Sequence, residues 1–366
     1  MTVFSVQEGA RRRIVWVDYA RALAILTVVL CHATESVYRM NLEGVGQAAW
    51  FSQVAAFAFF SVGRLGVPLF LFMSGYLMLD RSYGPKDCKR FWCSKWCGLL
   101  IATEVWIVLY FLFLNITQER PFSLPLLICN MLFLEPVGMG HMWYMPMIIG
   151  LYLFLPFIAN GLSLLEDWRL LRFPLAVMLA LLFAVPVLSV VKQALGGSSE
   201  ATLIDAGFSG GVYGCYMLLG YCVKKNAFKA APNWLVAALA LLAFAFTILL
   251  QLFSYGEGVR YNVWYNNGLI LLAGLALFEL FSRATSLRAN KLVSILSYYS
   301  FALYLVHFPV RLLLAPIVMG LPVVSALPRC CTVVILFVVV LALSLLLCSL
   351  IARIPKIGAK VLYLKS

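Results

Sequence analysis

Long runs of apolar residues, separated by short polar segments, dominate this chain. A helix that crosses a membrane needs about 20 mostly apolar residues. Runs of about that length recur ten times, and the segments between them are too short to fold alone. The predicted spans are residues 14–36, 52–79, 92–114, 141–161, 172–192, 208–223, 233–254, 263–283, 293–318 and 325–352. The pattern predicts an all-α polytopic membrane protein with about ten transmembrane helices.

Two segments need a separate interpretation. Residues 122–136 are apolar but short and bounded by prolines, which favours a re-entrant or interfacial segment over a span. The first apolar run follows basic residues but lacks a small-residue cleavage site, so we predict a retained helix and not a signal peptide. The whole chain, residues 1–366, is therefore predicted to be a single transmembrane domain with no separate soluble domain.

Composition supports this class and explains the charge. The chain is 63% hydrophobic and 12% charged, with a mean hydropathy of +0.96, whereas soluble domains are roughly half apolar and about a quarter charged. If residues 1–13, which include Arg11 and Arg12, are cytoplasmic, most of the 28 lysines and arginines fall in cytoplasmic segments. Both termini are predicted to be cytoplasmic. The net charge of +13 then reflects topology and attraction to membrane lipids, and no patch remains for nucleic acid.

The ten cysteines indicate neither a disulfide framework nor a metal site. Most lie in predicted spans or cytoplasmic segments, where thiols stay reduced. Cys93 and Cys97 share a helix face, but no second Cys/His pair lies nearby at zinc-site spacing. We expect no metal.

Arg21 and His32 lie within the first predicted span. Eleven residues is about three helical turns, so the two side chains share one face, together with Asp18 and Glu35. Charged and titratable groups in a membrane helix are costly, and by default they mark a functional site. The Cα atoms of Arg21 and His32 would lie about 16 Å apart, which suits an elongated substrate that enters from the cytoplasm. An Asp18–Arg21 pair with a packed histidine is the structural alternative.

The second predicted span contains Arg64 near mid-membrane, between glycines and before Pro68. Loosened backbone and a buried guanidinium would suit an anionic or polarised ligand. The alternative is a counter-ion for an acid such as Glu104. Ser74, at the inner end of this span, fits small-residue packing better than a nucleophile.

Further polar residues lie in or beside later apolar runs. His141 and Trp143 begin the fourth span at about the depth of His32, where an interfacial aromatic belt is the alternative. Tyr304 and His307 follow one helical stripe, where a hydrogen-bonded core histidine is the alternative. A group of aromatic and amide side chains could stack on a sugar or form an ordinary belt. Its members are Tyr261, Asn262, Trp264, Tyr265, Asn266 and Asn267.

Four ordered motifs carry a family resemblance. They are Asp18-Tyr-Ala-Arg21 with His32, the segment Gly66–Tyr76, His141-x-Trp143, and Ser300-Phe-Ala-Leu-Tyr304-x-x-His307-x-Pro309. Together they resemble acyltransferase family 3 of the membrane O-acyltransferases. Within it, the chain is most similar to the stand-alone bacterial branch that acetylates surface polysaccharides such as enterobacterial common antigen.

The resemblance implies transfer of an acyl group, usually acetyl, from cytoplasmic acyl-CoA to a sugar hydroxyl of a surface or lipid-linked polysaccharide. It also implies a place in the bacterial inner membrane and no bound cofactor, with acetyl-CoA as the donor substrate. His32, Arg21 and Arg64 are the expected catalytic residues. The expected substrate-binding residues are Asp18, Glu35, Ser74, His141, Trp143, Tyr304 and His307.

Three other interpretations remain open from the residues alone. Intramembrane charge and broken helices also occur in transporters and flippases for lipid-linked saccharides, although no inverted repeat is visible. In the second interpretation, the chain is a non-catalytic partner in an export complex. In the third, it is an acyltransferase whose donor carries a succinyl or longer acyl group.

Overall fold

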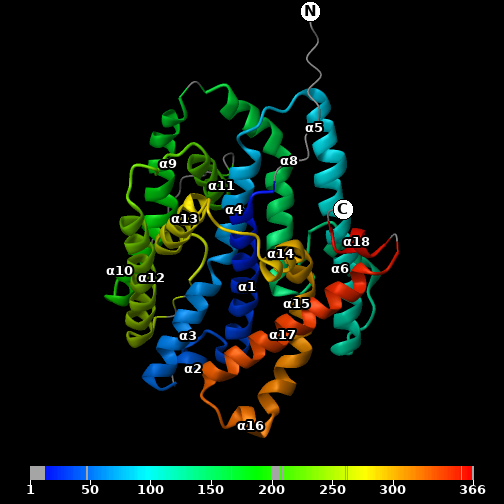
Figure 1. The fold of residues 1–366 in the computed structure, drawn as a ribbon. Helices are drawn as coiled ribbons and strands as arrows, with labels where there is room; N and C mark the ends of the chain where they lie inside the picture. Colours follow the sequence, from blue (N-terminus) through cyan, green and yellow to red (C-terminus); the bar gives the residue numbers. More distant parts are fainter. Residues whose placement is uncertain are drawn as a thin grey trace, which may run out of the picture.

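The structure, a computed structural model, describes residues 13–46, 48–165, 167–198, 207, 210–259, 261, 263–355 and 357–364. Within these ranges the regular structure is helical and contains no strand (Figure 1). Of the positions discussed above, Arg11, Arg12 and Asn262 lie outside the described residues.

Eight helical stretches of the described chain are long and apolar enough to cross a membrane, which agrees with a multi-pass membrane protein. They are Val15–Tyr38, Trp50–Met78, Pro85–Thr117, Gly140–Ser163, Trp168–Ala194, Asn233–Gly256, Ser300–Gly320 and Arg329–Ala352. The predicted spans 208–223 and 263–283 correspond to shorter helices, α11 (Gly211–Lys224) and α13 (Gly268–Arg283), of 14 and 16 residues. The number of ten and the cytoplasmic termini stay predictions.

Several of these stretches consist of consecutive helical pieces. The bounds are α1 Val15–Tyr38, α3 Trp50–Gly63, α4 Gly66–Met78, α5 Pro85–Phe91, η1 Trp92–Trp96, α6 Cys97–Thr117, η2 Gly140–Trp143, α8 Tyr144–Ser163, η3 Trp168–Leu171, α9 Arg172–Met178, η4 Leu179–Ala184, α10 Val185–Ala194, α12 Asn233–Gly256, α14 Lys291–Tyr298, α15 Ser300–Gly320 and α17 Arg329–Ala352. Short helices α2 (Leu42–Val45), α7 (Leu124–Met131), α16 (Pro322–Ser325) and α18 (Gly358–Val361) complete the order.

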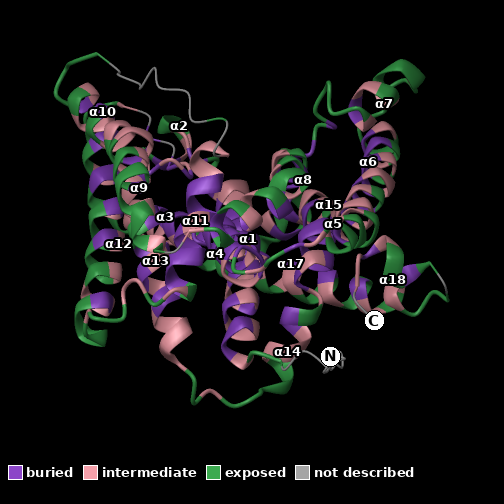
Figure 2. Ribbon diagram, turned by 90° about the horizontal axis from the view of Figure 1, so that it is seen from above, coloured by how far each residue is buried: buried purple, intermediate pink, exposed green. Residues whose placement is uncertain are grey.

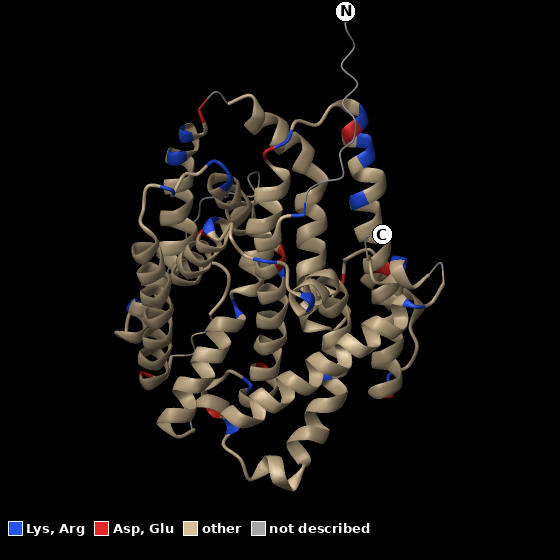
Figure 3. Ribbon diagram, viewed as in Figure 1, with Lys and Arg blue, Asp and Glu red and all other residues tan. Residues whose placement is uncertain are grey.

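Two predicted spans are interrupted. The helix predicted over 52–79 breaks between α3 and α4 at Arg64 and Leu65, and the one predicted over 293–318 breaks at Tyr299, between α14 and α15. The apolar segment 122–136 contains only α7, whose eight residues are too short to span a membrane. Figure 3 shows several basic residues along α5.

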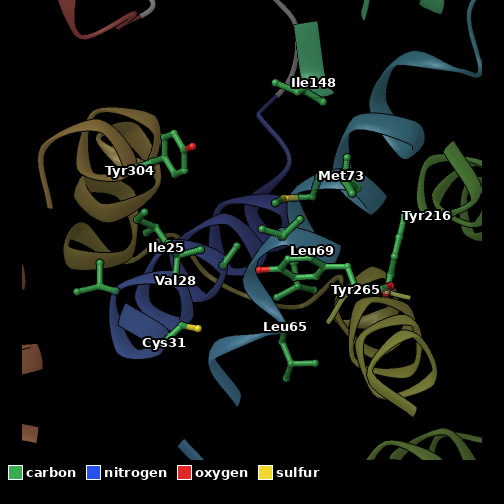
Figure 4. Packing of buried hydrophobic residues seen from close by; sticks show 14 of the residues in the cluster. Ile25, Val28, Cys31, Leu65, Leu69, Met73, Ile148, Tyr216, Tyr265 and Tyr304 are labelled. Carbon is green, nitrogen blue, oxygen red and sulfur yellow. Dashed lines mark hydrogen bonds between the residues drawn. The ribbon is translucent and has the colours of Figure 1, made fainter. Parts of the chain in front are cut away.

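Helix α1 lies in the middle of the bundle and contacts α3, α4, α13, α14, α15 and α17 (Figure 2). Ala20, Ala24 and Ile25 are fully buried, because their small or compact side chains let neighbouring helices approach closely. Figure 4 shows Ile25, Val28 and Cys31 of α1 among side chains of surrounding helices. Helix α1 is therefore enclosed largely by protein, and none of its residues is fully exposed.

Helices α4 and α11 meet through a reciprocal glycine contact. A Cβ on Gly75 would overlap the Met217 carbonyl oxygen, and a Cβ on Gly220 would overlap that of Phe72. Because both obstacles are backbone atoms, neither can rotate away.

We expect Gly220→Ala to lower the free energy of unfolding by about 1–3 kcal/mol through overpacking. Gly150→Ala is the matched control, since a Cβ at this helical glycine meets nothing within 4 Å. Thermal melting of the detergent-purified variants compares the two. Equal melting temperatures would contradict the close packing of α4 on α11.

Candidate functional site

The three histidines of the chain come together from three separate helical elements. His32 belongs to α1, His141 to η2 and His307 to α15. Their ring centroids are 5.4 Å apart for His32 and His307, 5.4 Å for His141 and His307, and 6.4 Å for His32 and His141. His141 and His307 are buried, whereas His32 retains partial exposure. A cluster of imidazoles therefore lies at the C-terminal end of α1.

Glu35 orients the His32 ring. The two residues are one turn apart on α1, and His32 Nδ1 lies 2.7 Å from Glu35 Oε2. An ionised carboxylate can only accept a hydrogen bond, so Nδ1 carries the proton. The neutral His32 ring then presents an unprotonated Nε2. This nitrogen is the atom of the pair that can take a proton from a substrate.

Arg64 reaches the same carboxylate from the break between α3 and α4. Its Nη2 lies 3.3 Å from Glu35 Oε1, and its Nη1 is 3.4 Å from the Tyr265 hydroxyl. The guanidinium also lies over the rings of Phe60 and Trp264, at 4.4 and 4.9 Å from their centroids. The acid beside Arg64 is thus Glu35 and not Glu104, the acid suggested by the sequence.

Glu104 lies on α6, where its Oε2 is buried and has no hydrogen-bond partner among the described residues. The sequence could suggest an acid for Arg64, but it could not choose between helices. The correct partner is 29 positions away along the chain and becomes adjacent only because α3 packs against α1.

The hydrogen bonds of Tyr110 define the tautomer of His141. The Tyr110 hydroxyl donates to the Leu305 carbonyl at 2.5 Å and lies 3.3 Å from His141 Nε2. Because its single proton is already donated, Nε2 must be the donor to the Tyr110 oxygen. His141 Nδ1 is then unprotonated, and it is buried without a hydrogen-bond partner among the described residues.

Two further bonds hold the cluster. Tyr304 donates its hydroxyl proton to the His141 carbonyl at 2.7 Å. His307 Nδ1 lies 2.9 Å from the Leu303 carbonyl, which can only accept, so the proton of the neutral His307 ring is on Nδ1. Phe308 stacks on His141, with ring centroids 4.4 Å apart. The rings are therefore held in place before any substrate binds.

A small cavity of about 20 Å³ adjoins these groups, with room for about one water molecule. Its lining combines aromatic, aliphatic and charged side chains from α1, α3, α4, η2, α8 and α15 and from the segment before α13. The lining residues are Val28, Cys31, His32, Gly63, Arg64, Val67, His141, Trp143, Tyr144, Tyr265 and Tyr304. Figure 4 shows four of them, Val28 and Cys31 on α1, Tyr304 on α15, and Tyr265 from the segment before α13.

Arg21 and Asp18 lie at the other end of α1 and do not line this cavity. Arg21 Nη1 is 3.3 Å from Ser297 Oγ and 3.8 Å from Asp18 Oδ1. Asp18 has closer partners, since it accepts from Arg13 at 2.5 Å and from Ser297 at 2.7 Å. The Arg21 side chain is 34% exposed.

Ser74 lies on this side of the molecule as well. Its hydroxyl donates to the Phe70 carbonyl at 3.0 Å and therefore accepts from the Tyr152 hydroxyl at 2.8 Å. Tyr152 is near enough to Arg21 to interact with it electrostatically. The predicted site residues are therefore divided between two regions, joined by α1.

Sequence reasoning passed over Tyr110 and Phe308. A tyrosine inside the third predicted span was an available signal, because a hydroxyl in an apolar helix needs a partner. Phe308 offered no signal, since phenylalanine is common in every apolar segment.

Comparison with known proteins gives one match. The family model of acyltransferase family 3, described as an acyltransferase domain, matches residues 14–353. No curated protein and no solved structure shows a significant match.

Proposed function

Because the chain belongs to acyltransferase family 3, it is an acyltransferase, and we propose that it moves an acetyl group from cytoplasmic acetyl-CoA to a sugar hydroxyl. The acceptor is a cell-surface or lipid-linked polysaccharide, and the enzyme lies in a bacterial inner membrane. The observation that carries this proposal is the Glu35 carboxylate, which contacts both His32 and Arg64, two residues that line one cavity.

In the proposed reaction, His32 Nε2 takes the proton of the acceptor hydroxyl. The hydroxyl oxygen attacks the thioester carbonyl carbon, and the carbonyl electrons move onto its oxygen. When this tetrahedral intermediate collapses, the carbon–sulfur bond breaks. His32 then returns the proton to the sulfur, which leaves as the thiol of CoA.

Glu35 and Arg64 support these steps. Glu35 was expected to bind substrate, but its bond to His32 Nδ1 favours a positioning role. The carboxylate holds the reactive tautomer and stabilises the imidazolium formed during the reaction. Arg64 is buried and is held in place by Glu35 and Tyr265. Its guanidinium supplies positive charge near the developing oxyanion.

Arg21 is proposed to bind the phosphate groups of acetyl-CoA at the cytoplasmic end of α1. The pantetheine arm would then follow α1 toward His32, over a distance of about 16 Å between the two Cα atoms. Arginine suits phosphate, because its planar group forms paired hydrogen bonds.

We expect Arg21→Ala to raise the KM for acetyl-CoA about tenfold or more, with a smaller effect on kcat, since it removes a charged hydrogen bond remote from the reacting atoms. Arg288→Ala is the control, because Arg288 is exposed and contacts α1 only through its backbone carbonyl. Steady-state assays of CoA release measure both variants. An unchanged KM would remove Arg21 from the donor site.

The function itself is tested in a cell that lacks its own polysaccharide acetyltransferase. Mass spectrometry of surface glycans, with and without this chain, should show an added acetyl group only when the chain is produced. The purified protein should also be stabilised thermally by CoA. Unchanged glycans together with no CoA effect would overturn the proposal.

A further inference from the structure

Arg311 is a second cation near the histidine cluster, although it is not among the residues that line the small cavity. It lies one turn after His307 on α15, and its Nη1 donates to Ser36 Oγ at 2.5 Å. Its guanidinium stacks over Phe308 at 4.2 Å from the ring centroid. It is close enough to Glu35, His141 and His307 to interact with all three electrostatically. The side chain is thus held at the site by two contacts.

The Nε of this guanidinium is unpaired. Ser36 occupies Nη1, whereas Nε is buried without a hydrogen-bond partner among the described residues. Nε and Nη2 form the edge that pairs with both oxygens of a carboxylate or with two oxygens of a phosphate. A fixed arginine with an unpaired Nε on this edge is suited to bind an oxyanion.

The charges around His32 point the same way. Glu35 is the acid within salt-bridge distance of Arg64, and no described acidic side chain lies within that distance of Arg311. Arg64 and Arg311 supply two positive charges near Glu35, which supplies one negative charge. The described residues of the site therefore leave one positive charge uncompensated. A charge without a partner inside a membrane protein is costly, and a bound anion would offset that cost.

The same site also requires a hydrogen-bond donor. His141 Nδ1 is an unprotonated acceptor with no partner among the described residues, and it belongs to a residue that lines the cavity. His307 Nε2 is likewise buried without a hydrogen-bond partner among the described residues, and the His32 Nδ1–Glu35 bond leaves His32 Nε2 as a further acceptor when that ring is neutral. Hydroxyl groups provide donors for such nitrogens. A complementary ligand therefore carries several hydroxyls and an oxyanion.

We propose that Arg311 binds the carboxylate or phosphate of an acidic sugar acceptor while neighbouring hydroxyls of that sugar donate to His32 and His141. The proposal rests on the acetyl-transfer function above and names its acceptor class. Selection for an acidic sugar would arise at the outer mouth of the site, where Ser36 and Arg311 are partly exposed.

The test measures binding without the acyl donor, using the full chain in nanodiscs of zwitterionic lipid. Methyl glucuronide and methyl glucoside form a matched pair that differs in the carboxylate, and glucose 1-phosphate supplies the phosphate. We expect the two acidic sugars to bind at least tenfold more tightly than the neutral one. Arg311→Gln should abolish this preference, and the control Arg329→Gln should retain it, because Arg329 is exposed and donates to the Gly44 carbonyl.

Arg311→Lys guards against a variant that fails to fold. Lysine keeps the positive charge but cannot form the bidentate hydrogen bonds of arginine, so we expect an intermediate preference for acidic sugars. Equal affinity for acidic and neutral sugars in the wild-type chain would overturn the proposal, as would an acidic preference that survives Arg311→Gln. Loss of the preference in nanodiscs that contain anionic lipid would assign the site to a lipid phosphate and also overturn it.

The acetyl-transfer assay with the same sugars separates the two proposals. Acidic-sugar binding without any acetyl transfer would count against the proposed function and leave the Arg311 assignment standing. Transfer to acidic and neutral sugars at equal kcat/KM would count against Arg311 alone.

Discussion

Replacing His32 with alanine is expected to lower the rate of acyl transfer by about 10²–10⁴-fold, the usual contribution of a general acid–base residue. The substitution removes Nε2, the acceptor whose free state is maintained by Glu35. Release of CoA in the presence of acceptor measures the rate, and surface-glycan mass spectrometry measures the product in cells.

Abundance and melting temperature of His32→Ala provide the control. His32 makes one side-chain hydrogen bond, to Glu35 on its own helix, so we expect the variant to fold. Near-wild-type acetylation by a variant of normal abundance would exclude His32 as the base. An inactive variant that still gains thermal stability from CoA would place the defect in chemistry and not in donor binding.

Glu35→Gln should lower kcat by roughly 10²–10⁴-fold, about as much as loss of the base His32. The amide removes the negative charge that stabilises the His32 imidazolium, and its NH₂ group can stabilise the wrong tautomer. It also leaves Arg64 without its acid at 3.3 Å. The proposed donor site lies at the other end of α1, so the KM for acetyl-CoA should change little.

Glu43→Gln is the control for Glu35→Gln. Glu43 is an exposed acid on α2, shortly after α1, and its amide should retain full activity. A Glu35→Gln enzyme with normal kcat and a raised acceptor KM would restore the substrate-binding role predicted from the sequence. A Glu35→Gln enzyme with normal kcat and normal acceptor KM would show that Glu35 has no role in the site.

Hydropathy was sufficient to predict a helical, multi-pass chain, because burial in lipid requires apolar runs of a defined length. It could not predict that the helix breaks at Arg64 and Leu65. Gly63 and Gly66 signal a loosened helix, but the location of the break depends on contacts. A Cβ on Gly63 would crowd the Cα of Cys31 on α1, so α3 approaches α1 at this glycine.

The site was partly predictable for the same physical reason. Helical periodicity places His32 and Glu35 on one face of α1, since only local geometry is involved. It cannot bring His141 and His307 to that face, because their positions depend on how η2 and α15 pack around α1. The sequence could not predict the tautomer of His141 either. That tautomer depends on the proton that Tyr110 donates to the Leu305 carbonyl on α15.

The placement of Arg21 and His32 on one continuous α1 has an energetic consequence for the cell. A rigid rod sets their separation, so the proposed reaction bridges two compartments without any moving carrier. Only a two-carbon unit would leave the cytoplasm, while the costly nucleotide portion of the donor is retained. The free energy of thioester cleavage would make this export directional, with no need for ATP hydrolysis or an ion gradient.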